Sequence, residues 1–332
     1  DLDPLPVRQG RAKAAAAFRN SSRLIGCGRL ALANCDPVTI DGAMRVPWRI
    51  REYLRRGRER RARRAANAAV ANFPTVARKS RHGLPGELIV SLTSYPPRFA
   101  TLAASLRSLL DQSVAADRTI LWLAGEDRAK LPQDVLALAA HGLEIRTCED
   151  WRSYKKLVPA LIEFPEATIV TADDDVYYSP DWLAQLVRAS VAHPGNVVGQ
   201  RVHMALLDRN GRFRSYNDWE FATDALIDRA PDAVIFPTGV GGVLYPPHAL
   251  DPSVVTSDAF LRLCPTGDDV WFFWMARLAG TSHRGLGNVF EHIEWEGSQD
   301  CGLVHENLSG SSPRWRTTSE NWPISGKSRQ TS

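Results

Sequence analysis

The sequence predicts an α/β fold whose mostly parallel central sheet is covered by helices on both faces. Between residues 87 and 172, short runs rich in Val, Ile and Leu alternate with stretches whose apolar residues recur at helical spacing. Such alternation is typical of strand–helix–strand units, which build parallel sheets. The chain has 332 residues, of which 44% are hydrophobic and 23% are charged, so it can bury the core that this sheet needs.

The elements of this region follow one another in a regular order. The first strand lies in ELIVSLTSYPP, which begins at Glu87 and is ended by Pro96 and Pro97, because proline cannot donate to a sheet. The helix FATLAASLRSLLDQS comes next, and two further helices are expected in QDVLALAAHG and YKKLVPALIEF. The remaining strands are expected at residues 118–125, 143–150 and 167–172.

The second half of the sequence is less regular. A strand is expected at residues 197–202, and Asn210-Gly211 is a hairpin turn signal. Residues 234–247 are glycine-rich and bounded by prolines. Residues 264–280 predict a loop, a capped helix start and a mostly buried helix.

Composition divides the chain into three parts. Residues 1–84 form a basic extension rich in Arg and Ala, expected to be helical or partly disordered, and residues 51–64 hold eight arginines against two glutamates. This segment could lie on an anionic membrane surface or be a solvated helix. The α/β domain is expected at residues 85–308, and a flexible tail at residues 309–332.

The remaining composition signals predict a cytoplasmic protein that is peripheral, at most, at the inner face of the plasma membrane. No run of about 18 apolar residues is present, and DLDPLPVRQG lacks the pattern of a secretory signal. The five cysteines are scattered without a CxxC pair, which favours reduced thiols. The arginine run lacks interleaved aromatic residues, so no nucleic-acid partner is expected.

Three adjacent carboxylates, Asp173, Asp174 and Asp175, follow the fourth expected strand in TADDDVYY. They repel one another, and a hard divalent cation such as Mn²⁺ or Mg²⁺ would offset that repulsion. In extended chain, Asp173 and Asp175 would point to one side, as metal ligands, and Asp174 to the other, toward a sugar or ribose. The alternative is a solvated acidic turn that caps the helix starting near Asp181.

Five motifs in this order and spacing carry a resemblance to a known family. They are SLTSYPPR (91–98), SYKKL (153–157), TADDDVYY (171–178), GVGGVLYPP (239–247) and GDDVWFFWMA (267–276). Together they resemble bacterial glycosyltransferases of the GT-A type, most of all a group with a DDD motif, and more distantly the family-2 and exostosin-type enzymes. The resemblance implies a metal-dependent enzyme that moves a sugar from a UDP- or GDP-linked donor to a glycan or glycolipid hydroxyl, in surface polysaccharide or glycoconjugate synthesis.

The resemblance also implies roles for single residues. Asp269 would be the general base of an inverting reaction and Asp268 a helix cap or acceptor contact, although the order of these two roles could be reversed. His292 and His305 are both placed to complete the metal site, and His305 is the assigned ligand beside Asp173 and Asp175. The expected donor-binding residues are Thr93, Ser94, Tyr95, Arg98, Lys155, Asp173 and Asp174.

The glycine-rich loop is the expected acceptor side. Gly239, Gly241 and Gly242 would let backbone approach a ligand closely, and Trp271 is assigned to the acceptor as well. The spacing is neither GxGxxG nor a phosphate loop, so neither NAD nor ATP is indicated. A tight bend between strands is the alternative for these glycines.

Two other functions are kept open. An aspartate-based phosphohydrolase also has an acidic motif after a strand, but Asp175 is followed by Val-Tyr-Tyr rather than by Gly or Thr. A non-catalytic module that binds a metal or a glycan is the other alternative.

Overall fold

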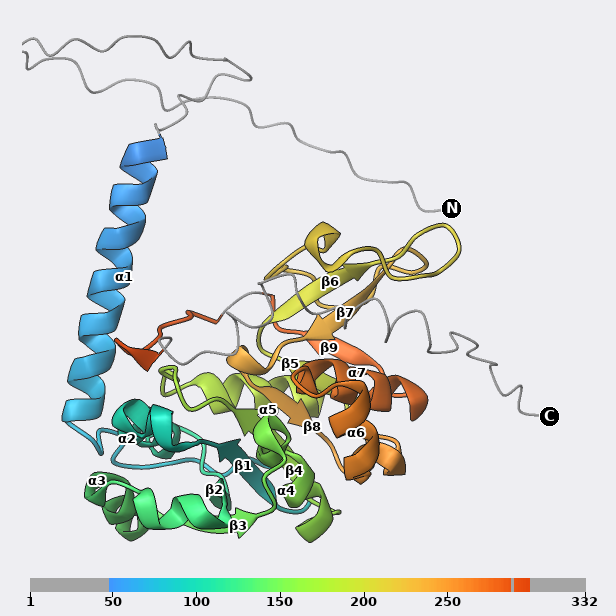
Figure 1. Ribbon diagram of the computed structural model, residues 1–332. Coiled ribbons are helices and arrows are strands. Elements are labelled where there is room, and N and C mark those ends of the chain that lie inside the picture. The colour runs from blue at the N-terminus through green and yellow to red at the C-terminus, as the bar shows by residue number, and fades with distance from the viewer. Residues whose placement is uncertain (1–47, 288–289, 299–332) are drawn as a thin grey trace, which may run out of the picture. The chain divides into compact units, whose positions relative to one another are not determined.

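The computed structural model describes residues 48–287 and 290–298 and contains a seven-stranded central sheet (Figure 1). The expected tail at residues 309–332, and His305, lie outside the described residues. The strand order is β3-β2-β1-β4-β8-β5-β9. The strands are β1 (Leu88–Thr93), β2 (Arg118–Ala124), β3 (Leu143–Cys148), β4 (Thr168–Ala172), β5 (Val197–Gly199), β8 (Val243–Tyr245) and β9 (His283–Gly285).

The sheet is mostly parallel, as the sequence predicts. Only β8 among these strands runs antiparallel to its neighbours, β4 and β5. Strands β1, β2 and β4 are buried almost throughout because both of their faces are covered. The α/β class is therefore confirmed.

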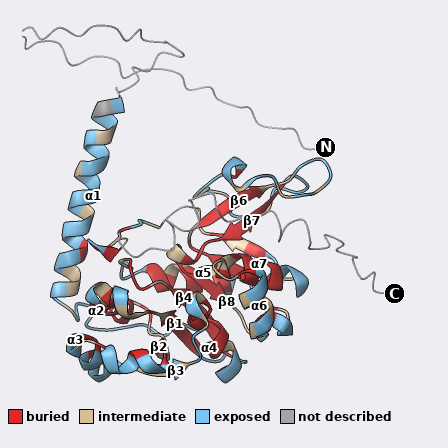
Figure 2. Ribbon diagram, viewed as in Figure 1, coloured by how far each residue is buried: buried red, intermediate tan, exposed pale blue. Residues whose placement is uncertain are grey.

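Helices cover both faces of the sheet, because successive strand residues point to opposite sides. Ile89 and Ile169 join the core that holds α4 and α7, whereas Val90 and Val170 join the core that holds α2 and α5. Figure 2 shows these strands buried between exposed helix faces. The helices are α2 (Phe99–Leu110), α3 (Gln133–Leu136), α4 (Val158–Glu163), α5 (Trp182–Ala192), α6 (Ser257–Leu263) and α7 (Asp268–Leu278).

Two expected helices are shorter than the sequence pattern indicates. QDVLALAAHG contains α3 and then a 3-10 helix at Ala137–His141. YKKLVPALIEF is divided into a 3-10 helix at Arg152–Lys156 and the helix α4. The reason for the second break is Pro159, whose ring would clash with the carbonyl of Lys155 in a continuous α-helix but is accepted in the first turn of α4.

The expected strand at residues 197–202 is divided between two sheets. Its first half is β5, and its second half begins β6 (Val202–Leu206), which pairs antiparallel with β7 (Ala233–Pro237). The chain turns between them beside β7, where a Cβ on Gly199 would lie 2.8 Å from the Pro237 Cβ. This turn brings Arg201 to the same edge of the central sheet as the ends of β1 and β4.

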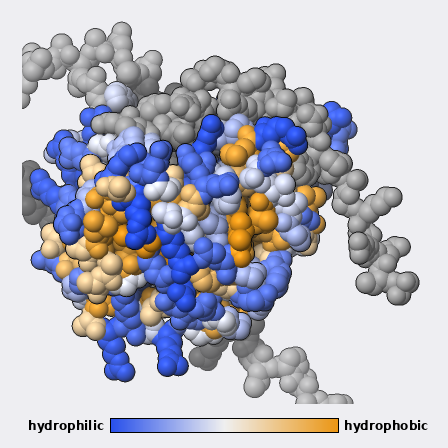
Figure 3. All heavy atoms as spheres, turned by 60° about the horizontal axis from the view of Figure 1, so that its bottom comes forward, coloured by the Kyte–Doolittle hydropathy of each residue, from blue (hydrophilic) through white to orange (hydrophobic). Residues whose placement is uncertain are grey.

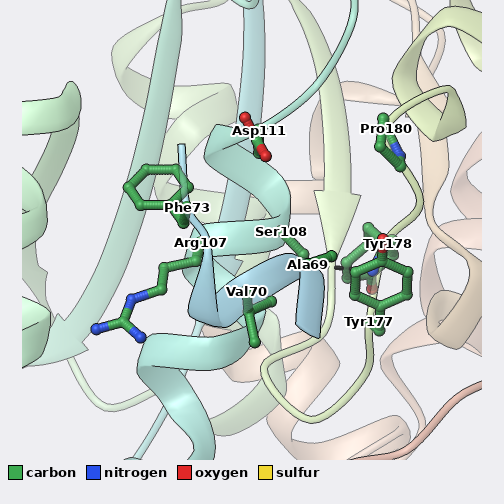
Figure 4. Close-up of a pocket in the computed structure, with 9 residues that line it drawn as sticks. All are labelled: Ala69, Val70, Phe73, Arg107, Ser108, Asp111, Tyr177, Tyr178 and Pro180. Atoms are coloured by element: carbon green, nitrogen blue, oxygen red, sulfur yellow. Dashed lines mark hydrogen bonds between the residues drawn. The ribbon is translucent and has the colours of Figure 1, made fainter. Parts of the chain in front are cut away.

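The basic extension contains a long helix, α1 (Trp48–Ala71). Its Arg-rich part is exposed, while Ala66, near the C-terminal end, packs against Ile293 and Trp295. A small cavity lies between this end of α1 and α2, lined among others by Val70, Phe73, Arg107 and Tyr177 (Figure 4). The end of α1 is thus attached beside the chain that follows the acidic motif.

The surface is mixed in polarity. The face in Figure 3 is largely hydrophilic with separate apolar patches. Exposed apolar side chains include Leu136, Ile162 and Leu263, on α3, α4 and α6. Within residues 48–287 and 290–298, no helix combines the length and the apolar character needed to cross a bilayer.

Candidate functional site

Four polar segments meet at one edge of the central sheet. Strands β1 and β4 are parallel and in register, with Leu92 opposite Ala172, so the segments after them leave the sheet together. Because β8 is antiparallel, its beginning pairs with the ends of β4 and β5, where Val243 lies opposite Thr171 and Gly199. The edge therefore gathers residues 93–98, 173–175, 200–201 and 239–242.

Arg98 binds two of the three adjacent carboxylates. Its Nη1 lies 2.8 Å from Asp174 Oδ1 and 2.6 Å from Asp175 Oδ2, and the Ser94 hydroxyl donates to Asp174 Oδ2 at 2.5 Å. Burial raises the pKa of Asp174 to about 6, although Arg98 opposes this shift. The alternating arrangement expected of the three aspartates is wrong, because the backbone bends at residues 174–175 and turns both side chains toward Arg98.

Lys156 brings the acidic motif to the beginning of α7. Its Nζ lies 3.2 Å from Asp173 Oδ1, 2.9 Å from Asp268 Oδ2 and 3.9 Å from Asp269 Oδ1. The side chain is buried, which by itself would lower its pKa, but the three carboxylates raise the pKa of Lys156 well above its ordinary value. Lys156 is therefore a buried, charged ammonium shared by three carboxylates.

Asp269 is a carboxylate of this group whose acidity is clearly shifted. Burial, with Asp268 adding to it, raises the pKa of Asp269 to about 7, although Lys156 opposes the shift. Its Oδ2 accepts a hydrogen bond of 2.9 Å from the Gly239 backbone N–H. The carboxylate is thus oriented by the glycine loop and titrates near neutral pH.

The glycine loop is built so closely around these side chains that larger residues would not fit. A Cβ on Gly239 would lie 2.6 Å from Lys156 Nζ, and one on Gly241 would lie 2.7 Å from the Arg201 Cβ. Gly242 has a φ of +87°, and a Cβ added to it would lie 2.5 Å from the Trp182 ring. The loop is both a tight bend and a wall of the site.

Lys155 and Trp271 are not where the sequence analysis expects them. Lys155 points away from the acidic motif and pairs with Asp150, so Lys156 takes the place beside the carboxylates. Trp271 is buried in the core, where its Nε1 donates to the Val254 carbonyl at 3.0 Å, and it cannot form an acceptor surface. Lys155 and Lys156 are neighbours in the short 3-10 helix Arg152–Lys156, and the phase of this helix decides that Lys156 faces the site.

The remaining predicted residues have mixed positions. Thr93 Oγ1 donates to the Trp122 carbonyl at 2.8 Å, which ties β1 to β2. The Tyr95 ring lies 5.9 Å from the Arg98 guanidinium carbon, at the rim of the site. His292 is partly exposed, with its Nε2 3.4 Å from Glu294.

The donor set at this edge fits a divalent cation in chemistry and charge. Five carboxylates face two cations, Arg98 and Lys156, and the pKa of Asp173 is raised by burial and further by its acidic neighbours. Among the described residues, no three His, Cys, Asp or Glu side chains converge enough to hold an ion alone. Asp175 is engaged by Arg98, so an ion would be held by the partly exposed Asp173 together with oxygens of a bound ligand.

Two functional candidates were missed by the sequence analysis. Tyr178 Oη accepts a hydrogen bond of 2.7 Å from the Asp173 backbone N–H and fixes the first residue of the motif. Arg201 lies directly beside the glycine loop. Tyr178 belongs to the quoted motif and could have been considered, whereas the turn that places Arg201 has no clear signal in the sequence.

The comparisons with known proteins are confined to structure. No family model and no curated protein sequence matches the chain. The chain is similar to S. aureus TarS 1–349 in complex with UDP, with 14% identity and a TM-score of 0.44 over 62% of this chain and 59% of that one. It thus spans about three fifths of that structure.

Two further solved structures are similar over different lengths. One is the glucosyl-3-phosphoglycerate synthase of Mycobacterium tuberculosis in complex with Mn²⁺, UDP and glucosyl-3-phosphoglycerate (17% identity, TM-score 0.27, 35% of this chain and 44% of that one). The other is the inositol-1-phosphate CTP transferase of T. maritima (12%, 0.36, 67% and 94%). Every one of these TM-scores is below 0.5, so these similarities do not establish the function of this chain.

Proposed function

We propose that the chain is a glycosyltransferase of the GT-A type, which moves a sugar from a nucleoside diphosphate donor to a hydroxyl acceptor. The observation that carries this proposal is the position of Lys156, whose buried ammonium holds together Asp173 of the acidic motif and Asp269 at the start of α7. This group lies at the carboxyl edge of a parallel sheet, which is where α/β folds bind nucleotides. It also lies against the glycine loop, where the absence of a side chain at Gly239 leaves the space that Lys156 and Asp269 occupy.

The donor would bind across the ends of β1 and β4. Ser94, Tyr95 and Arg98 shape the rim on the β1 side, and Arg98 keeps Asp174 and Asp175 in place. Asp173 would hold Mn²⁺ or Mg²⁺ with phosphate oxygens of the donor, and the bound ion would supply positive charge for the departing diphosphate. Lys156, fixed beneath Asp173, keeps that carboxylate oriented.

Asp269 would accept the proton of the acceptor hydroxyl. A pKa of about 7 leaves a substantial ionised fraction at neutral pH and makes the carboxylate a stronger base than an ordinary aspartate. The Gly239 N–H fixes one oxygen, and the other faces the ammonium of Lys156. Direct attack of the activated hydroxyl on the sugar would invert its anomeric configuration.

The experiment is a donor screen followed by one substitution. Thermal unfolding with UDP- and GDP-sugars, with and without Mn²⁺, should show a raised midpoint for the donor that binds. Asp269→Asn should keep this shift and lose transfer by about 10²–10⁴-fold, the usual size of general-base catalysis. Asp258→Asn, an exposed aspartate on α6, is the matched control.

Two results would reject the proposal. One is the absence of donor binding and of UDP or GDP release across the panel. The other is phosphate release from simple phosphate esters without any sugar nucleotide, which would favour the phosphohydrolase. Full transfer activity of Asp269→Asn would reject only the role of Asp269 as the base.

The same proposal includes an acceptor at an anionic membrane, in surface polysaccharide or glycoconjugate synthesis. On α1, Ala66 faces the body of the protein, whereas Tyr53, Arg60 and Arg64 are exposed and lie on another face by helical spacing. An exposed aromatic ring beside arginines suits the boundary of an anionic bilayer. Replacing Arg60, Arg61 and Arg64 by Gln should reduce co-sedimentation with phosphatidylglycerol vesicles and leave transfer to a short water-soluble acceptor unchanged; equal co-sedimentation would reject this contact.

A further inference from the structure

Arg201 is a guanidinium in the site that the proposed chemistry does not use. Its backbone is fixed to the glycine loop, since the Thr238 N–H donates to the Arg201 carbonyl at 3.0 Å and the neighbouring Gln200 N–H donates to the Gly242 carbonyl at 3.1 Å. A side chain would not fit at position 241, because Arg201 occupies the space that its Cβ would need. The arginine is therefore placed by the same loop that orients Asp269.

The polar contacts of Arg201 differ from those of the other two cations of the site. Arg98 and Lys156 each contact at least two carboxylates. Arg201 Nη1 instead donates to the neutral Thr238 hydroxyl at 3.3 Å, and within the described part of the chain it forms no ion pair. Burial lowers the pKa of Arg201, and the electrostatic effects of Tyr216 and Asp269 oppose this shift. A partly buried guanidinium without a carboxylate is costly unless a ligand completes it.

The position of Arg201 along the sheet edge indicates which part of a bound ligand it would contact. Along the sheet edge, Arg98 follows β1, the acidic motif follows β4, and Arg201 follows β5 on the far side of β8. Arg201 is thus separated from the Arg98 side by the acidic motif and the glycine loop. It lies on the side of Asp269, whose Oδ2 the Gly239 N–H holds.

We propose that Arg201 binds an anionic group, a phosphate or a carboxylate, of the acceptor, next to the hydroxyl that Asp269 activates. This inference rests on the proposed function in one respect, that the bound molecule is the acceptor. The anion site itself rests on the geometry of Arg201. A planar guanidinium donates two parallel hydrogen bonds to such oxyanions, so it would select acceptors that carry one near the reacting hydroxyl.

The test measures anion binding directly, by titration calorimetry with glycerol 1-phosphate, glycerate and uncharged glycerol. The protein with Arg201 should bind one or both anions, more tightly than glycerol, and should still bind them when saturated with UDP and Mn²⁺. Arg201→Gln should weaken this binding by about tenfold or more, the size of a charge-assisted pair of hydrogen bonds. Arg201→Lys should restore part of it. Arg209→Gln, an exposed arginine in the turn after β6, is the matched control and should bind as the unaltered chain does.

The outcomes separate this inference from the proposed function. Equal anion binding by Arg201→Gln and the unaltered chain would overturn the inference, and so would displacement of the anion by UDP, which would assign the anion to the donor. UDP affinity of Arg201→Gln should be unchanged, which also shows that this variant is folded. Arg201-dependent anion binding in a protein that binds no sugar nucleotide would uphold the anion site and reject the glycosyltransferase.

Discussion

Two cations, the buried Lys156 and the partly buried Arg98, hold the acidic edge together in different ways. Arg98 serves two carboxylates that are adjacent in sequence, and the Ser94 hydroxyl and the Ser105 hydroxyl complete the bonding around Asp174. Lys156 serves three carboxylates from two distant parts of the chain and leaves them with excess negative charge. The comparison indicates that the Arg98 group is a support, whereas the Lys156 group keeps charge available for a ligand.

The largest effect is expected from Lys156→Met, which keeps most of the length of the side chain and removes its charge. Leaving the buried Asp268 and the partly exposed Asp173 and Asp269 without their shared ammonium should lower the free energy of unfolding by about 3–5 kcal/mol. The loss should be larger at pH 8 than at pH 5.5, because the raised pKa values of Asp173 and Asp269 mean that a lower pH protonates and neutralises them. Urea unfolding at both pH values measures this.

Lys155→Met is the matched control for that prediction. Lys155 is also buried, but its one carboxylate partner, Asp150, is largely exposed and can be solvated. Its loss should therefore be smaller and should depend less on pH. Equal losses in the two variants would contradict the special position given to Lys156.

Substitution of Arg98 should affect the free energy of unfolding more than the transfer reaction. Arg98→Met should cost about 3 kcal/mol of unfolding free energy, since Asp174 and Asp175 lose their buried partner. Arg98→Lys should recover part of this loss but not all, because an ammonium lacks the planar fork of the guanidinium. A variant with unchanged stability and abolished transfer would show that Arg98 acts on the substrate rather than as a support.

A single methyl group on the glycine loop tests the Lys156 group from its other side. Gly239→Ala places a Cβ 2.6 Å from Lys156 Nζ and 2.9 Å from Asp269 Oδ1, so both side chains must move. Transfer should fall by roughly 10²-fold, the effect of a displacement of about 1 Å at a reacting group. Gly125→Ala, where a Cβ would meet nothing within 4 Å, should have no effect, and equal activity of the two variants would contradict the prediction.

The smallest effect is expected from pH. Because the pKa of Asp269 is about 7, kcat/KM should increase as pH rises from 6 to 8 and level off above that range. The apparent pKa belongs to the group formed with Lys156, Asp268 and Asp173, so it should change in variants of any of them. A flat profile over this range would exclude proton transfer to Asp269 as a rate-determining event.

Local patterns predicted the elements and the place of the acidic motif, but not the contacts within it. The strands β1, β2 and β4 contain apolar runs, and parallel register then brings the ends of β1 to β4 to one edge. The choice between Lys155 and Lys156 depends on where Pro159 ends the 3-10 helix, and the orientation of Asp175 depends on a guanidinium 77 residues earlier. The position of Arg201 depends on a change of sheet after Gly199, which an apolar run cannot reveal.

The chain that follows α7 helps to fix the conformation of the acidic motif. The Trp295 N–H donates to the Asp175 carbonyl, the Tyr177 N–H donates to the Ile293 carbonyl, and the Trp295 indole donates to Ser105. These hydrogen bonds hold the acidic motif through residues that lie about 120 positions further along the chain. A shortened protein that stops at Gly280 would keep every acidic side chain of the cluster but lose these hydrogen bonds, so a competent unit must include Trp295.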